Sequence, residues 1–124
     1  KVAAGLAKGV HPAVGLGAAE RVPAQHLLYK SIDEMAGALE KEKVRSGLRR
    51  TAVRTLDGLK DFRVPTLLIA GGQDVVFPAF LAEAIASKLP CATAQLIPDS
   101  GHSPYFEQAA TFNPLVGAFL ALHP

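Results

Sequence analysis

The chain has 124 residues, 49% of them apolar, which is typical of a globular domain with a real core rather than of a disordered chain. Its formal net charge of +2 is too small to indicate a nucleic-acid partner. The first residues show no basic stretch followed by a long apolar one, so no secretory leader is predicted, and the longest apolar run falls far below the roughly 18 residues that a membrane-spanning helix needs, so no membrane partner is expected. A single cysteine, Cys91, excludes an internal disulfide, which favours a reducing, cytoplasmic compartment, and this cysteine is expected to be buried.

Residues 1–60 are predicted to be helical and to contain no strand. Prolines at positions 12 and 23 suit the first turns of helices, and apolar residues recur at helical spacing in two stretches: Leu28, Ile32, Met35 and Leu39, then Val44, Leu48, Ala52 and Leu56. Basic residues surround the second stretch. Because no aromatic residues lie between them, we expect the solvated face of an amphipathic helix rather than a nucleic-acid patch.

Two further patterns in the chain bear on cofactor and metal binding. The segment Gly15-Leu16-Gly17 weakly resembles a dinucleotide-binding turn, but no predicted strand precedes it, so no cofactor is predicted. The histidines at positions 11, 26 and 123 show no metal-ligand spacing with Cys91 or with carboxylates, so no metal site is predicted.

Residues 61–124 are predicted to alternate strand, helix, strand and helix. Val64 to Ala70 is a short apolar run closed by two glycines, which indicates a fully buried parallel strand, and Thr93 to Ile97 forms the second strand. A helix opens at Pro78 between them. A last helix follows, and Pro114 is expected in its first turn, where a missing N–H costs little. This order predicts an α/β fold, with parallel strands covered by helices.

An aspartate and a histidine follow the two predicted strands. Asp74 comes four residues after the first strand, and His102 comes five residues after the second. Because parallel strands bring their carboxyl ends to one edge of a sheet, we expect these two side chains to meet there. A carboxylate that orients an imidazole leaves the other ring nitrogen free to act as a general base, which is two thirds of a nucleophilic triad.

Each of these residues also has a structural alternative. Asp74 could be a turn residue or could cap the helix near Pro78, and a histidine in a loop is often exposed or a satisfied local donor. Glu107 could be a second carboxylate of the site, but it is expected to support the loop that leads into the last helix. Asp99 is expected to shape the turn before Gly101.

The motifs of the second half together resemble those of a known family. The stretches Val64-Pro65-Thr66-Leu67-Leu68-Ile69-Ala70-Gly71-x-x-Asp74-x-x-x-Pro78 and Ile97-Pro98-x-Ser100-Gly101-His102-Ser103-Pro104 resemble the carboxyl-terminal part of the α/β-hydrolase fold. The resemblance implies that Asp74 is the catalytic acid and His102 the catalytic base. It also implies a cap-like segment at residues 1–60 and a core part at residues 61–124. The implied reaction is hydrolysis of an ester, thioester or amide bond in a small acyl-type substrate.

The family's nucleophile motif, G-x-S-x-G on a strand-to-helix turn, does not occur in this sequence. We therefore expect the nucleophile to come from an amino-terminal half outside this chain, and the chain by itself to be inactive. The alternative is a non-catalytic half fold that forms a homodimer through its sheet edge. Dehalogenation, carbon–carbon bond hydrolysis and cofactor-free perhydrolysis also stay open, because one fold hosts many reactions.

Overall fold

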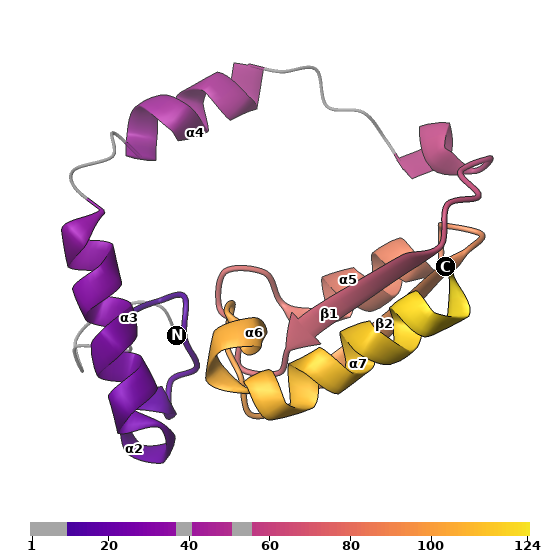
Figure 1. Cartoon of the computed structure of the whole chain (residues 1–124). Helices are drawn as coiled ribbons and strands as arrows, with labels where there is room; N and C mark the ends of the chain where they lie inside the picture. Colours follow the sequence, from indigo (N-terminus) through magenta and orange to yellow (C-terminus); the bar gives the residue numbers. More distant parts are fainter. Residues whose placement is uncertain (1–9, 37–40, 51–55) are drawn as a thin grey trace.

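The computed structural model describes residues 10–36, 41–50 and 56–124 (Figure 1). Leu39 and Ala52 of the predicted helical stretches lie outside these ranges. The elements are, in chain order, the helices α2 (Ala18–Arg21), α3 (Pro23–Met35) and α4 (Lys41–Arg50), the 3₁₀ helix η1 (Leu56–Leu59), then β1 (Thr66–Gly71), α5 (Ala79–Ala86), β2 (Ala92–Ile97), α6 (Pro104–Glu107) and α7 (Ala109–Leu122). The predicted α/β fold is confirmed, and the strands lie within about two residues of their predicted bounds.

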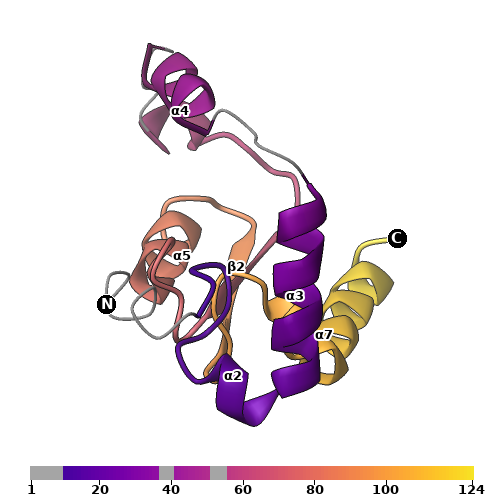
Figure 2. The ribbon, with the colours of Figure 1, turned by 90° about the vertical axis from the view of Figure 1, so that its left-hand side faces the viewer.

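The two strands pair in parallel, with Thr66 opposite Ala92 and Gly71 opposite Ile97. A parallel pair needs a crossover connection, which α5 provides. Helices α5 and α7 lie on opposite faces of this sheet (Figure 2). Because successive side chains of a strand point to opposite faces, Leu67 and Ile69 line the α7 side, whereas Ala70 lines the α5 side.

The expectation that β1 is fully buried is wrong for this chain. Within β1 only Ala70 and Gly71 are buried, and Val64, just before the strand, is 57% exposed. The reason is that the sheet of the described residues has two strands, so one edge of β1 and parts of both faces have no cover. An all-apolar strand is typical of the interior of a larger sheet. Cys91 at the start of β2 is likewise exposed, not buried as expected.

The last helix also differs from the expectation. Helix α7 begins at Ala109, so Pro114 is its sixth residue and lies beyond the first turn. The carbonyl of Gln108 accepts the amides of Thr111 and Phe112 and thereby starts the helix earlier than predicted. Pro114 is exposed, so its missing N–H removes one helical hydrogen bond without burying an unpaired group. None of the helices in the described ranges is long and apolar enough to cross a membrane.

The segment before α3 packs against the loops that follow the strands. Val10, Val14 and Ala18 form a small buried cluster, against which Tyr29 of α3 packs. The ring of Tyr29 meets that of Phe106 edge to face at 5.4 Å and so connects α3 to α6. Figure 1 shows α2, α3 and α6 gathered beyond the carboxyl end of β1. Part of the predicted cap-like segment therefore supports the strand ends directly.

Glycines allow the loops at this end of the sheet to touch through their backbones. A Cβ atom at Gly71 would overlap the carbonyl oxygen of Gly101, and one at Gly72 would lie 2.5 Å from the carbonyl oxygen of Pro98. A Cβ at Gly101 would in turn overlap the backbone of Val14 and Gly15. The two strand-end loops and the segment before α2 thus lie closer together than any side chain would permit.

We predict that Gly71→Ala lowers the free energy of unfolding by about 1–3 kcal/mol, because the new methyl group displaces the backbone of the loop after β2. Gly117→Ala in α7 is the matched control, since its Cβ meets nothing within 4 Å. The control should raise stability by roughly 0.5–1 kcal/mol through helix propensity. Urea unfolding followed by circular dichroism measures both, and equal effects of the two variants would contradict the close approach.

Candidate active site

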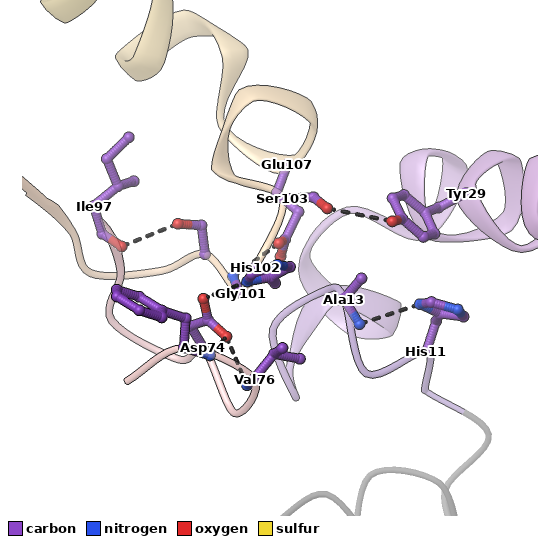
Figure 3. A network of polar contacts seen from close by, with 12 residues as sticks. His11, Ala13, Tyr29, Asp74, Val76, Ile97, Gly101, His102, Ser103 and Glu107 are labelled. Atoms are coloured by element: carbon purple, nitrogen blue, oxygen red, sulfur yellow. Dashed lines mark hydrogen bonds and ion pairs between the residues drawn. The ribbon is translucent and has the colours of Figure 1, made fainter. Parts of the chain in front are cut away.

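The structure brings Asp74 and His102 together at the carboxyl edge of the sheet. Asp74 lies in the turn after β1, and His102 lies in the loop between β2 and α6. The Nδ1 atom of His102 is 2.8 Å from the Oδ2 atom of Asp74 (Figure 3). The parallel pairing of the strands explains this contact, since both loops leave the same edge of the sheet.

The second carboxylate oxygen of Asp74 shapes its own turn. Oδ1 accepts hydrogen bonds from the backbone amides of Val76 at 2.7 Å and Phe77 at 2.8 Å. These bonds do not cap α5, whose N-cap Pro78 has no side-chain hydrogen bond, so the alternative role as a cap of that helix is wrong. The carboxylate is held by three donors, and its side chain is only 5% exposed. Asp74 is therefore fixed in orientation by its turn while Oδ2 faces the imidazole.

The imidazole of His102 has one engaged nitrogen and one open nitrogen. Because the Asp74 carboxylate only accepts hydrogen bonds, Nδ1 carries the proton and Nε2 carries the lone pair in the neutral ring. No residue in the described part of the chain hydrogen-bonds to Nε2. The His102 side chain is 46% exposed, so Nε2 can meet a group that this chain does not supply.

Backbone hydrogen bonds hold the two site loops to each other. The amide of Gly72 donates to the carbonyl of Ile97 at 2.9 Å, and the amide of Gln73 donates to the carbonyl of Ser100 at 2.8 Å. The hydroxyl of Ser100 is buried and also donates to the carbonyl of Ile97. Two backbone hydrogen bonds, both just before the aspartate, thus connect the loop that carries Asp74 to the loop that carries His102.

Glu107 lies behind the site rather than in it. Its carboxylate is buried, with Oε1 accepting the amide of Gly101 and Oε2 accepting the amide of Gly15, both at 2.8 Å. Burial raises the pKa of Glu107 above its ordinary value of 4.5, and the backbone amides of Gly15, Gly101 and Ser103 and the nearby Arg21 charge oppose this shift. The geometry agrees with the expected support of the loop, but the bond to Gly15 joins residues 92 positions apart and has no signal in the sequence.

Arg21 is a second residue that sequence reasoning missed. Its guanidinium donates to the backbone carbonyl of Asp99 at 2.9 Å and to the side chain of Gln73 at 3.3 Å. These bonds connect the end of α2 to both site loops. Asp99 lies in the turn before Gly101, as expected, and its carbonyl is the group used there. A shallow groove beside Asp74 is lined in part by Leu16, Arg21 and Val75, together with Gly17, Gly72 and Gln73.

The remaining histidines do not gather around the site. His11 accepts the amide of Ala13 at Nδ1, and its Nε2 lies 3.3 Å from the Asp33 carboxylate, so it holds the segment before α2 to α3. In the described ranges no group of three or more histidine, cysteine, aspartate or glutamate side chains could hold a metal ion. Gly15 and Gly17 precede a helix of four residues, with no strand between residue 10 and α2, which is not a dinucleotide-binding arrangement.

Comparison with known proteins agrees with this architecture. The family model described as the alpha/beta hydrolase fold matches residues 16–109, and the chain belongs to this family. A Mycobacterium tuberculosis protein named as a non-heme bromoperoxidase, BpoC, is 33% identical over 66 residues, which cover 53% of this chain and 25% of the relative. The chain thus spans about a quarter of the length of the curated relatives it matches.

Solved structures give the same result. The BpoC crystal structure matches with a TM-score of 0.53 at 32% identity, over 56% of this chain and 26% of that one. A serine hydrolase involved in carbazole degradation matches with a TM-score of 0.53 at 25% identity, over 58% of this chain and 28% of that one. The match to an N-acyl homoserine lactone degrading enzyme covers 87% of this chain and 43% of that one, with a TM-score of 0.66. At 24% identity this match shows the fold alone.

We predict that Glu107→Gln lowers the free energy of unfolding by about 1–3 kcal/mol, because an amide has one acceptor oxygen and leaves one of the two buried backbone N–H groups without a partner. Since the pKa of Glu107 is raised in the folded protein, the folded state holds this proton more tightly than the unfolded chain. The contribution of Glu107 to the free energy of unfolding is therefore complete below pH 4.5 and declines as the pH rises through the raised pKa of the folded state.

Denaturant unfolding of the wild type and of Glu107→Gln at a series of pH values measures this difference. Glu83→Gln is the matched control, because Glu83 is exposed on α5 and should show no such pH-dependent gap. A gap between the wild type and Glu107→Gln that grows with rising pH would contradict the direction given for the pKa of Glu107.

Proposed function

We propose that the chain supplies the acid, Asp74, and the base, His102, of a Ser-His-Asp triad that hydrolyses an ester, thioester or amide bond in a small acyl-type substrate. The observation that carries this proposal is the 2.8 Å contact between the buried Asp74 carboxylate and Nδ1 of a half-exposed imidazole. The membership in the α/β-hydrolase family and the similarity to a protein described as a serine hydrolase support it.

In this mechanism Nε2 of His102 accepts the proton of a serine hydroxyl as the oxygen attacks the substrate carbonyl. The Oδ2 atom of Asp74 accepts the Nδ1–H bond and stabilises the imidazolium that forms. His102 then gives the proton to the leaving group. A water molecule next attacks the acyl-serine, with His102 again as the base, and the carboxylic acid product is released. The bonds from Val76 and Phe77 to Oδ1 keep the carboxylate in place throughout these steps.

The nucleophile in this proposal belongs to an amino-terminal half that lies outside the present sequence. The five serines of the chain are otherwise engaged: Ser31, Ser46 and Ser87 donate to helical carbonyls, Ser100 donates to Ile97, and Ser103 lies 3.4 Å from the hydroxyl of Tyr29. None sits in a G-x-S-x-G turn. The greater length of the curated relatives also supports a further part.

The surface over β1 and α7 is the proposed docking site for that half. An open apolar groove there is lined by Leu67, Ile69, Phe112, Val116, Phe119 and Leu120. Leu120 is 59% exposed. An added strand beside β1 would complete its hydrogen bonding, and side chains of the added half that pack on the α7 face would cover Leu67 and Ile69. The alternative occupant is a second copy of this chain, which would make a non-catalytic homodimer.

We also propose that residues 1–60 belong to a cap over the substrate site. Helix α3 exposes several large apolar side chains, namely Leu27, Leu28, Ile32 and Met35. Such a surface is unusual on a solvated helix and suits an acyl chain or another apolar covering. The segment before α3 has a second role, since it packs against the loop of His102.

We predict that the chain, co-expressed with an amino-terminal segment that carries G-x-S-x-G, hydrolyses p-nitrophenyl butyrate. In this complex Asp74→Asn should lower kcat by about 10⁴, because the amide reverses the imidazole tautomer. His102→Gln should lower kcat by about 10³ or more, because it removes the imidazole that accepts the proton of the nucleophile. The control Asp61→Asn alters an exposed aspartate before β1 and should leave kcat unchanged.

Full activity in Asp74→Asn and His102→Gln would contradict the proposed roles. A second activity is tested in the same preparation, because the curated relatives are named as non-heme bromoperoxidases. If bromination with added hydrogen peroxide and bromide exceeds ester hydrolysis, the acyl-hydrolase assignment is wrong, even where both residues are needed.

We predict that the amino-terminal half binds the chain one to one and that Leu120→Glu weakens this binding at least about tenfold, because a charge would enter the apolar groove. Phe80→Glu is the matched control, since Phe80 is 65% exposed on α5, on the opposite face of the sheet. Analytical ultracentrifugation measures both. A stable homodimer of twice 13.0 kDa that excludes the amino-terminal half would favour the alternative occupant.

A further inference from the structure

Glu107 is a buried carboxylate that the proposed mechanism does not use. Within the described part of the chain its carboxylate makes no hydrogen bond to Asp74 or His102, and its two oxygens accept amides from two separate parts of the chain. One amide belongs to Gly101, the residue directly before His102, and the other belongs to Gly15, in the segment before α2. Figure 3 shows Glu107 and Gly101 beside His102.

A buried carboxylate is costly unless donors replace the water that it loses. At Glu107 the donors that replace water are backbone N–H groups. Within the described part of the chain, Arg21 supplies the one positive charge that acts on this carboxylate. A structural role for a loop could be filled by a neutral side chain at lower cost. A carboxylate carries two acceptor oxygens on one planar group, so each of two separate N–H donors can meet its own oxygen.

We infer that Glu107 is a positioning residue, which holds the loop of His102 and the segment around Gly15 in one arrangement and thereby keeps the imidazole against Asp74. This inference rests on the proposed function, because it assigns a role toward the same acid–base pair. It assigns a role to a residue that is neither the acid nor the base of the pair.

The contacts around Gly101 show how Glu107 affects the position of His102. The backbone of Gly101 lies against that of Val14 and Gly15 so closely that no Cβ fits between them. The amide of Gly101 is anchored by Oε1 of Glu107 at 2.8 Å. Since His102 is the next residue, a shift of this amide moves the imidazole relative to Asp74, whose own position is fixed by its turn.

The same carboxylate also places one wall of the groove beside Asp74. The Gly15 amide that it accepts comes just before Leu16 and Gly17, which line that groove together with Arg21. Arg21 connects this wall to Gln73 and to Asp99. Glu107 therefore couples the wall of the groove to the base, so a change at Glu107 alters both together.

Nuclear magnetic resonance of the full chain tests the inference without any turnover, so its failure is distinct from a failure of the proposed activity. The ring nitrogens and the Nδ1–H proton of His102 are measured in the wild type, in Glu107→Gln and in the control Glu83→Gln. In Glu107→Gln the Nδ1–H proton and the Gly101 amide should exchange at least about tenfold faster, because one anchoring bond to a charged acceptor is lost. In Glu83→Gln both should exchange as in the wild type.

The amides of Thr66 and Gly72, which bond to carbonyls of Cys91 and Ile97, report in the same spectra whether the sheet is still folded. If Glu107→Gln is folded and the His102 signals are unchanged, the inference is overturned. If Glu107→Gln does not fold, a pH titration of the wild type decides. The Gly15 and Gly101 amide shifts should then follow the Glu107 carboxyl carbon with one midpoint, and amides that instead follow His102 or Asp74 would overturn the inference.

Discussion

The parallel pairing of β1 with β2 is the constraint on which the rest of the structure depends. It ends both strands at one edge, with Gly71 opposite Ile97, so that the turn of Asp74 and the loop of His102 start side by side. An antiparallel pair would have sent these loops to opposite edges. The glycines at positions 71, 72 and 101 then let the backbones touch, which brings a carboxylate and an imidazole within one hydrogen bond.

The two carboxylates near this edge differ in what they hold. Asp74 uses one oxygen to fix its own turn and offers the other to His102. The tendency of aspartate to accept nearby backbone amides thus orients the carboxylate for the proposed chemistry. Glu107 uses both oxygens on backbone amides and lies behind the histidine loop. Their environments explain this difference. Asp74 contacts the half-exposed imidazole of His102, whereas backbone groups enclose the carboxylate of Glu107 and burial raises its pKa.

The apolar surfaces of the chain explain why a covering partner belongs to the proposed function. Leu67 and Ile69 point to a groove beside α7 that the described residues leave open. A strand with apolar side chains on both faces is stable when helices and neighbouring strands cover it. The same missing cover accounts for the error in predicting the burial of β1, since the residue pattern describes the strand of a complete sheet and the chain contains a part of it.

The order of helices and strands, the parallel pairing and the two candidate side chains could be predicted from the sequence, because strand periodicity, closing glycines and residues just beyond strand ends are local signals. The start of α7 was misplaced, because the hydrogen bonds to the carbonyl of Gln108 outweigh the preference of proline for a first turn. The anchoring of Gly15 by Glu107, 92 positions away, and the bonds of Arg21 to both site loops were decided by tertiary structure alone. These contacts join segments far apart in the chain, and the sequence does not indicate which distant groups each side chain meets.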